Sequence, residues 1–127
     1  MKRTLIMTLC VLAAALAVCA GSMLALNGTV ERARRLQSLA VLAVQEGRPD
    51  DAGELLVSLA ELWRDRAPLL ETLAEHDALH DVTAAIAEAQ ICLECDDHDD
   101  FLRCMAIVDG ALSHIRDEEA LRLSNLY

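Results

Sequence analysis

Residues 4–26 read TLIMTLCVLAAALAVCAGSMLAL, which is a run of 23 residues without a charged side chain. As an α-helix rising about 1.5 Å per residue, this run covers roughly 34 Å, more than the about 30 Å of a bilayer's hydrocarbon core. Lys2 and Arg3 directly precede it. The sequence therefore predicts a basic tail at residues 1–3 and a transmembrane signal-anchor at residues 4–26 that contacts membrane lipid.

Two processed forms of the amino terminus compete with a retained anchor. Residues 18–20, VCA, resemble a signal-peptidase site, and residues 16–19, LAVC, partly match a lipoprotein box that would be lipidated at Cys19. The apolar run continues to Leu26, beyond both sites, and valine is a poor residue directly before a lipidated cysteine. We therefore favour the uncleaved anchor over a secreted or lipidated form.

Basic residues flank both ends of the anchor, because Arg32, Arg34 and Arg35 follow it. The two flanks are nearly balanced in the charge bias that sets membrane orientation. A three-residue basic tail is readily retained in the cytoplasm. We therefore expect a single-pass protein of the cell membrane with its soluble domain on the extracytoplasmic side.

The composition of the remaining chain favours helices and excludes nucleic acid as a partner. Hydrophobic residues make up 54% of the sequence, yet Trp63, Phe101 and Tyr127 are its only aromatic residues, which suits close helix packing better than a sheet sandwich. All 21 acidic residues follow Leu26, together with nine of the 11 basic ones, for a formal charge of −12. Such a polyanion repels phosphate backbones.

Apolar residues recur at spacings of three and four after residue 27, which predicts helices. We expect the first helix to continue from the membrane to Gly47 and Pro49, where a cap and a stop follow each other. A second helix capped by Asp50 and a long third helix from Pro68 to Leu93 follow. Asp99 or Asp100 is expected to cap a fourth helix.

Two stretches share one plan, which is a helix end, a turn with aspartates and an apolar helix. They are EGRPDDAGELLVSLAEL at residues 46–62 and ECDDHDDFLRCMAIVDGAL at residues 94–112. The predicted fold is therefore all-α, with the transmembrane helix followed at residues 27–116 by a small antiparallel helical bundle of two helix hairpins. The tail at residues 117–127 is expected to fold back on the bundle.

Four residues near the third turn could bind a metal ion. Cys92, Cys95, His98 and Cys104 form the pattern C-x2-C-x2-H-x5-C, which contains the ligand types of a tetrahedral zinc site. A disulfide between Cys92 and Cys104 is an alternative, because both lie symmetrically about a turn at His98 and an extracytoplasmic domain permits it. The third interpretation is inert thiols, and it is the one that we favour.

Other candidate residues lie on the second and third helices and in the tail. His76 and His80 are one helical turn apart beside carboxylates, so a cation site there is conceivable, although solvated histidines are more common. Trp63 is expected in the core, with a partner contact as the alternative. The tail carries the remaining candidates for partner contact, which are Leu121, Leu123, Leu126 and Tyr127.

The chain resembles domain-of-unknown-function family 4363 in three places. These are Trp63, the segment Glu75-His76-Asp77 that leads into Ile86, and the ending H-I-x-x-x-E-x-L-x-L-x-N-aliphatic-aromatic at residues 114–127. The resemblance implies a small bacterial protein with one amino-terminal membrane segment and no assigned activity. The cysteines near the third turn depart from the family pattern, so any chemistry there belongs to this chain.

The sequence contains no Ser-His-Asp order, phosphate-binding loop, dinucleotide turn or H-E-x-x-H zinc helix, so we do not expect an enzyme, a cofactor or a small-molecule substrate. The function predicted is an interaction or assembly module for an envelope membrane protein. The alternative is a metal-binding or thiol redox-sensing domain that uses the cluster of Cys92, Cys95, His98 and Cys104.

Overall fold

The structure is a computed structural model that describes the backbone of residues 1–125. Within this range it describes every side chain except those of Leu73, Glu119, Arg122, Leu123 and Asn125. The described chain is helical apart from short turns, and its elements are α1 (Lys2–Gln45), α2 (Pro49–Asp65), α3 (Ala67–Leu73), α4 (His76–Glu94) and α5 (His98–Asn125). The predicted all-α class is confirmed.

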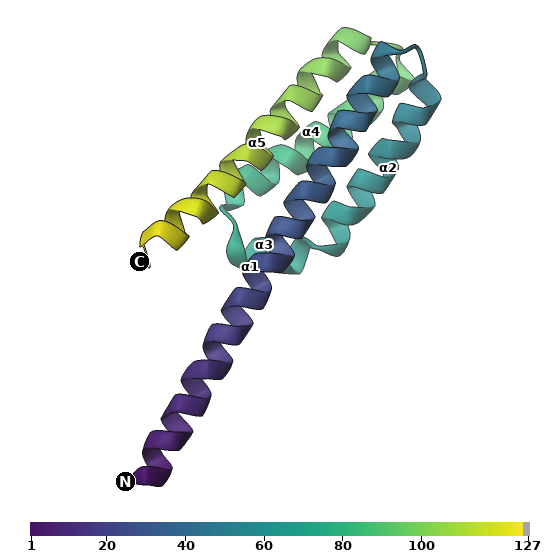
Figure 1. Cartoon of the computed structure of the whole chain (residues 1–127). Coiled ribbons are helices and arrows are strands. Elements are labelled where there is room, and N and C mark those ends of the chain that lie inside the picture. The colour runs from purple at the N-terminus through teal and green to yellow at the C-terminus, as the bar shows by residue number, and fades with distance from the viewer. Residues whose placement is uncertain (126–127) are drawn as a thin grey trace.

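Four helices form an antiparallel bundle in the order α1, α2, α4, α5, and the short α3 crosses one end of it (Figure 1). The hairpin of α1 and α2 packs beside the hairpin of α4 and α5, as the sequence predicts. We call the end that α3 crosses the α3 end and the opposite end, where both hairpins turn, the turn end. The amino-terminal half of α1 extends alone beyond the α3 end (Figure 1).

The bundle core contains one stripe of apolar residues from each long helix. In α1 the stripe has several alanines, including Ala33 and Ala40 with no exposed surface, which lets the neighbouring backbones approach closely. Larger side chains from the facing helices fill the rest of the core, such as Leu56 from α2, Val82 from α4 and Phe101 from α5. The single tryptophan of α2 is also buried, as expected.

Both hairpins turn through the same motif, in which the helix ends with one residue in the left-handed conformation. Gly47 has a φ of 76°, and Arg48 N–H donates to the carbonyl of Ala43 at 2.7 Å. Asp96 has a φ of 55°, and Asp97 N–H donates to the carbonyl of Cys92 at 2.9 Å. These bonds satisfy carbonyls that a helix end otherwise leaves without a partner.

The helix starts after these turns differ in detail from the prediction. Pro49 is the first residue of α2 rather than a stop, and Asp50 makes no side-chain cap bond but lies in the first turn. In α5 the cap is Asp97, whose Oδ1 accepts a hydrogen bond from Asp100 N–H at 3.2 Å. The prediction that Asp99 or Asp100 caps this helix is therefore wrong. Both residues lie in the first turn of α5, where their charges complement the helix dipole.

The prediction of one long third helix from Pro68 to Leu93 is wrong, because the helix is interrupted at Ala74. Ala74 is extended, with φ −117° and ψ 161°, and separates α3 from α4. Leu70 of α3 is 1% exposed, since α3 packs across the end of the bundle against α1. A single straight helix could not place Leu70 there, so tertiary burial outweighs the helical propensity of residues 68–93.

The carboxy-terminal residues do not form a separate element in the described part of the chain. Residues 117–125 continue α5 without a turn, and Leu121 is 63% exposed rather than packed on the bundle. The expected fold-back at residue 117 is therefore not seen up to Asn125. Residues 126 and 127 lie outside the described residues.

Candidate functional site

The amino-terminal half of α1 leaves its apolar side chains without protein contacts. Among them, Leu5, Leu12 and Leu16 are between 55% and 62% exposed, and Leu26 is the first residue buried in the bundle. The uncharged run therefore ends where the bundle begins. Within the described residues, α1 is the one helix that is long and apolar enough to cross a membrane.

A groove lies between α2 and α4, and α3 closes one end of it. Trp63, Leu70, Leu79 and Ile86 form its apolar base, and the exposed Ala87 lies at its edge. The hollow has a volume of about 440 Å³. Its size and apolar lining are those of a site that receives an apolar side chain or ligand.

A second hollow continues this groove towards the turn end. Gln90 lines both hollows, and the second one is also lined by Gly53, Val57 and Leu93. A methyl group added at Gly53 would meet no atom within 4 Å, so the surface here is open. We call the two hollows together the α2–α4 groove.

Charged side chains form the rim of the α2–α4 groove. At the turn end the rim is acidic, with Asp50, Glu54 and Glu94. At the α3 end Arg64 and Glu71 balance each other in formal charge. A basic group would therefore be favoured over the turn end of the groove.

His76 and His80 are exposed and line the α3 end of the groove. They are not part of any group of three or more metal-ligating side chains that converge among the described residues. The alternative of a cation site at this pair therefore has no third converging ligand among the described residues. Trp63, by contrast, is only 6% exposed and is both a core residue and a wall of the groove.

The four residues of the candidate zinc cluster, the interpretation that we did not favour, do not come together. Cys95 and His98 are exposed at the end of α4 and the start of α5, and no group that includes them converges as metal ligands do. Cys92 and Cys104 are buried, are both free thiols, and lie close enough across the hairpin of α4 and α5 for each to affect the pKa of the other. The symmetric placement inferred from the turn is thus observed for this pair.

The environment of Cys92 and Cys104 makes both thiols poor nucleophiles. Burial raises the pKa of the Cys104 thiol to about 11, with a further contribution from the negative charge of Glu88. Burial also raises the pKa of Cys92. Because the thiolate is the reactive form, both side chains behave as small apolar core residues in this structure.

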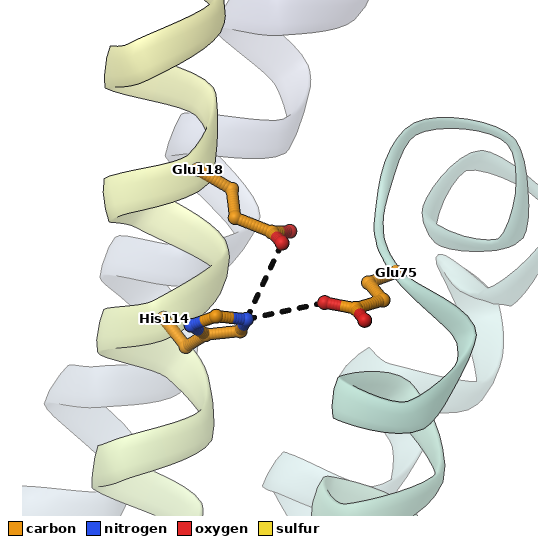
Figure 2. Close-up of side chains that lie close together, drawn as sticks. All are labelled: Glu75, His114 and Glu118. Atoms are coloured by element: carbon orange, nitrogen blue, oxygen red, sulfur yellow. Dashed lines mark hydrogen bonds and ion pairs between the residues drawn. The ribbon is translucent and has the colours of Figure 1, made fainter.

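A cluster that the sequence did not predict joins the start of α4 to the end of α5. His114 Nε2 lies 3.1 Å from Glu75 Oε2 and 3.3 Å from Glu118 Oε1 (Figure 2). The hydrogen bond to Glu75 is the largest cause that raises the pKa of His114, and the bond to His114 is the largest that lowers the pKa of Glu75. The His114 and Glu118 spacing of four residues was visible in the sequence, but Glu75 is 39 residues away.

The tail candidates for partner contact can be placed only in part. Leu121 lies on an exposed surface of α5. Leu123 belongs to α5, but its side chain lies outside the described residues, as do Leu126 and Tyr127 altogether. Partner contact through these three residues stays a prediction.

Comparison with protein-family models, with curated proteins and with solved structures finds no match to this chain. The resemblance to domain-of-unknown-function family 4363 therefore stays a prediction. Three features of the molecule bear on its function: the uncovered half of α1, the α2–α4 groove, and the cluster of Glu75, His114 and Glu118.

Proposed function

We propose that this chain is a single-pass, membrane-anchored docking module without catalytic activity, and that it holds a helix of an envelope membrane protein in the α2–α4 groove. The observation that carries the proposal is an apolar groove on the side of a bundle whose first helix is itself long and apolar enough to span a membrane. The extracytoplasmic side is proposed for the bundle, because the short basic tail favours cytoplasmic retention.

The anchor is supported by exposure as well as by composition. A core helix of a soluble protein would bury its apolar side chains, whereas only 6% of the most apolar window of α1 is buried. Exposing this many leucines and alanines to water is unfavourable by about 25 cal/mol for each Å². Lipid is the environment that removes this cost.

A helix is the occupant that best fits the α2–α4 groove. The groove follows α4 from Leu79 to Leu93, which corresponds to about 21 Å and so to a helix of about 14 residues. Gly53 and Ala60 on α2 and Ala87 on α4 are small, which allows the backbone of a docked helix to approach closely.

The charge of the rim specifies the occupant further. Asp50, Glu54 and Glu94 surround the turn end, so the partner helix is expected to be amphipathic with basic residues at that end. Because the groove opens sideways, its partner is expected to stand beside this chain in the same membrane. The thiol-sensor alternative lacks such support, since Cys95 and His98 lie apart from the buried cysteine pair.

Site-specific photo-crosslinking in native membranes tests this proposal. A photoreactive residue replaces either Val57 in the groove or Leu39 on α1, which are 49% and 45% exposed and therefore comparably accessible. We expect crosslinking from Val57 but not from Leu39, to an apolar helix of a membrane protein that carries basic residues. Equal crosslinking from both positions, or crosslinking to soluble proteins alone, would refute groove docking.

A blocking substitution provides the second arm. Ala87→Trp places a large side chain at the edge of the groove, whereas Ala84→Trp changes an exposed alanine of the same helix that does not line it. We expect the first substitution to abolish the Val57 crosslink and the second to leave it unchanged. Extraction with alkaline carbonate tests the anchor separately, because an integral protein stays in the membrane pellet.

A further inference from the structure

We propose that Glu75, His114 and Glu118 bind a divalent transition-metal ion, and that Zn²⁺ is the ion that suits this ligand set best. One ligand atom from each side chain lies within 4.8 Å of the other two (Figure 2). Imidazole nitrogen and carboxylate oxygen are common zinc ligands, and three protein ligands with one position left for water is a recurrent arrangement. This inference does not depend on the docking function.

Two of the three distances within the cluster, those from His114, match the edges of a coordination shell. Metal–ligand bonds of about 2.1 Å place neighbouring ligand atoms about 3.0 Å apart in octahedral geometry and about 3.4 Å apart in tetrahedral geometry. The observed separations from His114 Nε2 are 3.1 Å to Glu75 and 3.3 Å to Glu118. The third separation, between ligand oxygens of Glu75 and Glu118, is at most 4.8 Å, so the three ligand atoms already lie near one another before an ion binds.

His114 alone cannot provide a hydrogen-bond donor to both carboxylates of this cluster. The Nε2 atom of His114 carries at most one proton, so it can donate one hydrogen bond, yet two carboxylates converge on it. One carboxylate oxygen of Glu75 also lies within 4.8 Å of one of Glu118, which brings two like charges together. A divalent cation neutralises both carboxylates and uses the lone pair of a neutral imidazole.

The surroundings of the cluster favour a cation and discriminate among cations. Glu75 and His114 also line an open hollow of about 350 Å³ together with Asp77 and Asp81, and these carboxylates raise the local cation concentration. The imidazole ligand disfavours Mg²⁺ and Ca²⁺, which prefer oxygen ligands alone. The exposure of Glu75, with 47% of its side chain accessible, leaves room for water as a further ligand.

Metal binding at this position would join two distant parts of the chain. Glu75 is the residue that precedes α4, directly after the extended Ala74, and the other two ligands lie in the second half of α5. The ion would hold the start of α4 against α5 and thereby position α3, which forms the closed end of the α2–α4 groove. Zinc is therefore expected to raise the Tm of the bundle.

The test uses the full-length protein with Cys95→Ser, purified in detergent micelles, and ZnCl₂ as the probe. Isothermal titration together with metal analysis should show one saturable site for each chain. His114→Gln and Glu118→Gln should each weaken zinc binding at least about tenfold and remove the zinc-dependent rise in Tm. His80→Gln removes another exposed histidine that also lies close in sequence to carboxylates, and should change neither result.

X-ray absorption at the zinc edge separates this site from the remaining cysteines. Nitrogen and oxygen ligands without sulfur are expected. Three outcomes would each overturn the proposal: no saturable binding below about 100 µM zinc, sulfur in the coordination shell, or an equal loss of zinc affinity in His80→Gln and His114→Gln. The comparison uses only variants whose circular dichroism matches that of the parent protein.

Discussion

Alkylation kinetics should separate the buried cysteine pair from the exposed cysteine of the same hairpin. The perturbation is iodoacetamide at pH 8, applied to the folded protein with Cys10 and Cys19 of the anchor replaced by alanine. With a pKa of about 11, the thiolate of Cys104 is populated in about one molecule in a thousand at this pH, compared with about one in four for an ordinary thiol. The thiolate population alone therefore predicts alkylation about 200-fold slower than for an ordinary exposed thiol, and burial adds to this protection.

Timed quenching and peptide mass spectrometry provide the assay. Cys95 should be modified first, and Cys92 and Cys104 only slowly until guanidinium unfolds the bundle, when all three should react. Modification of folded Cys104 as fast as Cys95 would refute the reasoning from burial. If the pair stayed unmodified after unfolding until a reductant was added, the two thiols would be joined as a disulfide and not free.

The same pKa shift has a consequence for stability. Because the folded bundle keeps Cys104 protonated above the pH at which an exposed thiol ionises, the folded state binds more protons than the unfolded state between about pH 8.5 and the folded pKa. The free energy of unfolding should therefore fall as pH rises through this window. Cys104→Ala should reduce this pH dependence, as measured by guanidinium titrations at several pH values.

Three further predictions can be checked by guanidinium unfolding monitored by circular dichroism. Gly47→Ala should destabilise the bundle by about 1 kcal/mol, because Gly47 has a positive φ that alanine adopts only with strain. Gly53→Ala should stabilise the bundle by about 0.5–1 kcal/mol, because Gly53 lies inside α2 with open space around it. A change of stability in the same direction for both variants would contradict the assigned turn. Leu56→Ala removes a side chain with no exposed surface and should cost about 2–5 kcal/mol, while the neighbouring Val57→Ala should stay within about 0.5 kcal/mol. Asp97→Ala should cost about 1 kcal/mol, since it removes the side-chain cap of α5, and an unchanged midpoint would show that the cap contributes nothing.

Sequence periodicity was sufficient to predict the class of the fold and the pairing of its hairpins. The repeated plan at residues 46–62 and 94–112 corresponds to one shared turn motif, in which Gly47 and Asp96 occupy equivalent positions. These features depend on residues close together in the chain. The conformational preferences of neighbouring residues therefore determine these features, and those preferences can be read from the sequence.

The break at Ala74 was not predictable in the same way. No glycine or proline marks it, and it exists because Leu70 gains burial by crossing the end of the bundle. Likewise, neither the α2–α4 groove nor the contact between Glu75 and His114 has a local signal, because each depends on how helices far apart in sequence pack. The pairing of Cys92 with Cys104 lies between these cases, since a turn of known position predicts which residues face each other.

Helix α1 continues without a break from its uncovered half into the bundle. This continuity fixes the direction in which the groove points around the axis of α1. A flexible tether would allow the bundle to turn freely above the bilayer, but a continuous helix makes bundle and anchor one rigid rod. One alanine inserted after the exposed Leu24 would rotate the groove by about 100° relative to the anchor and raise it by about 1.5 Å. In the proposed membrane-anchored arrangement, the phase of α1 thus determines the lateral direction that the groove faces.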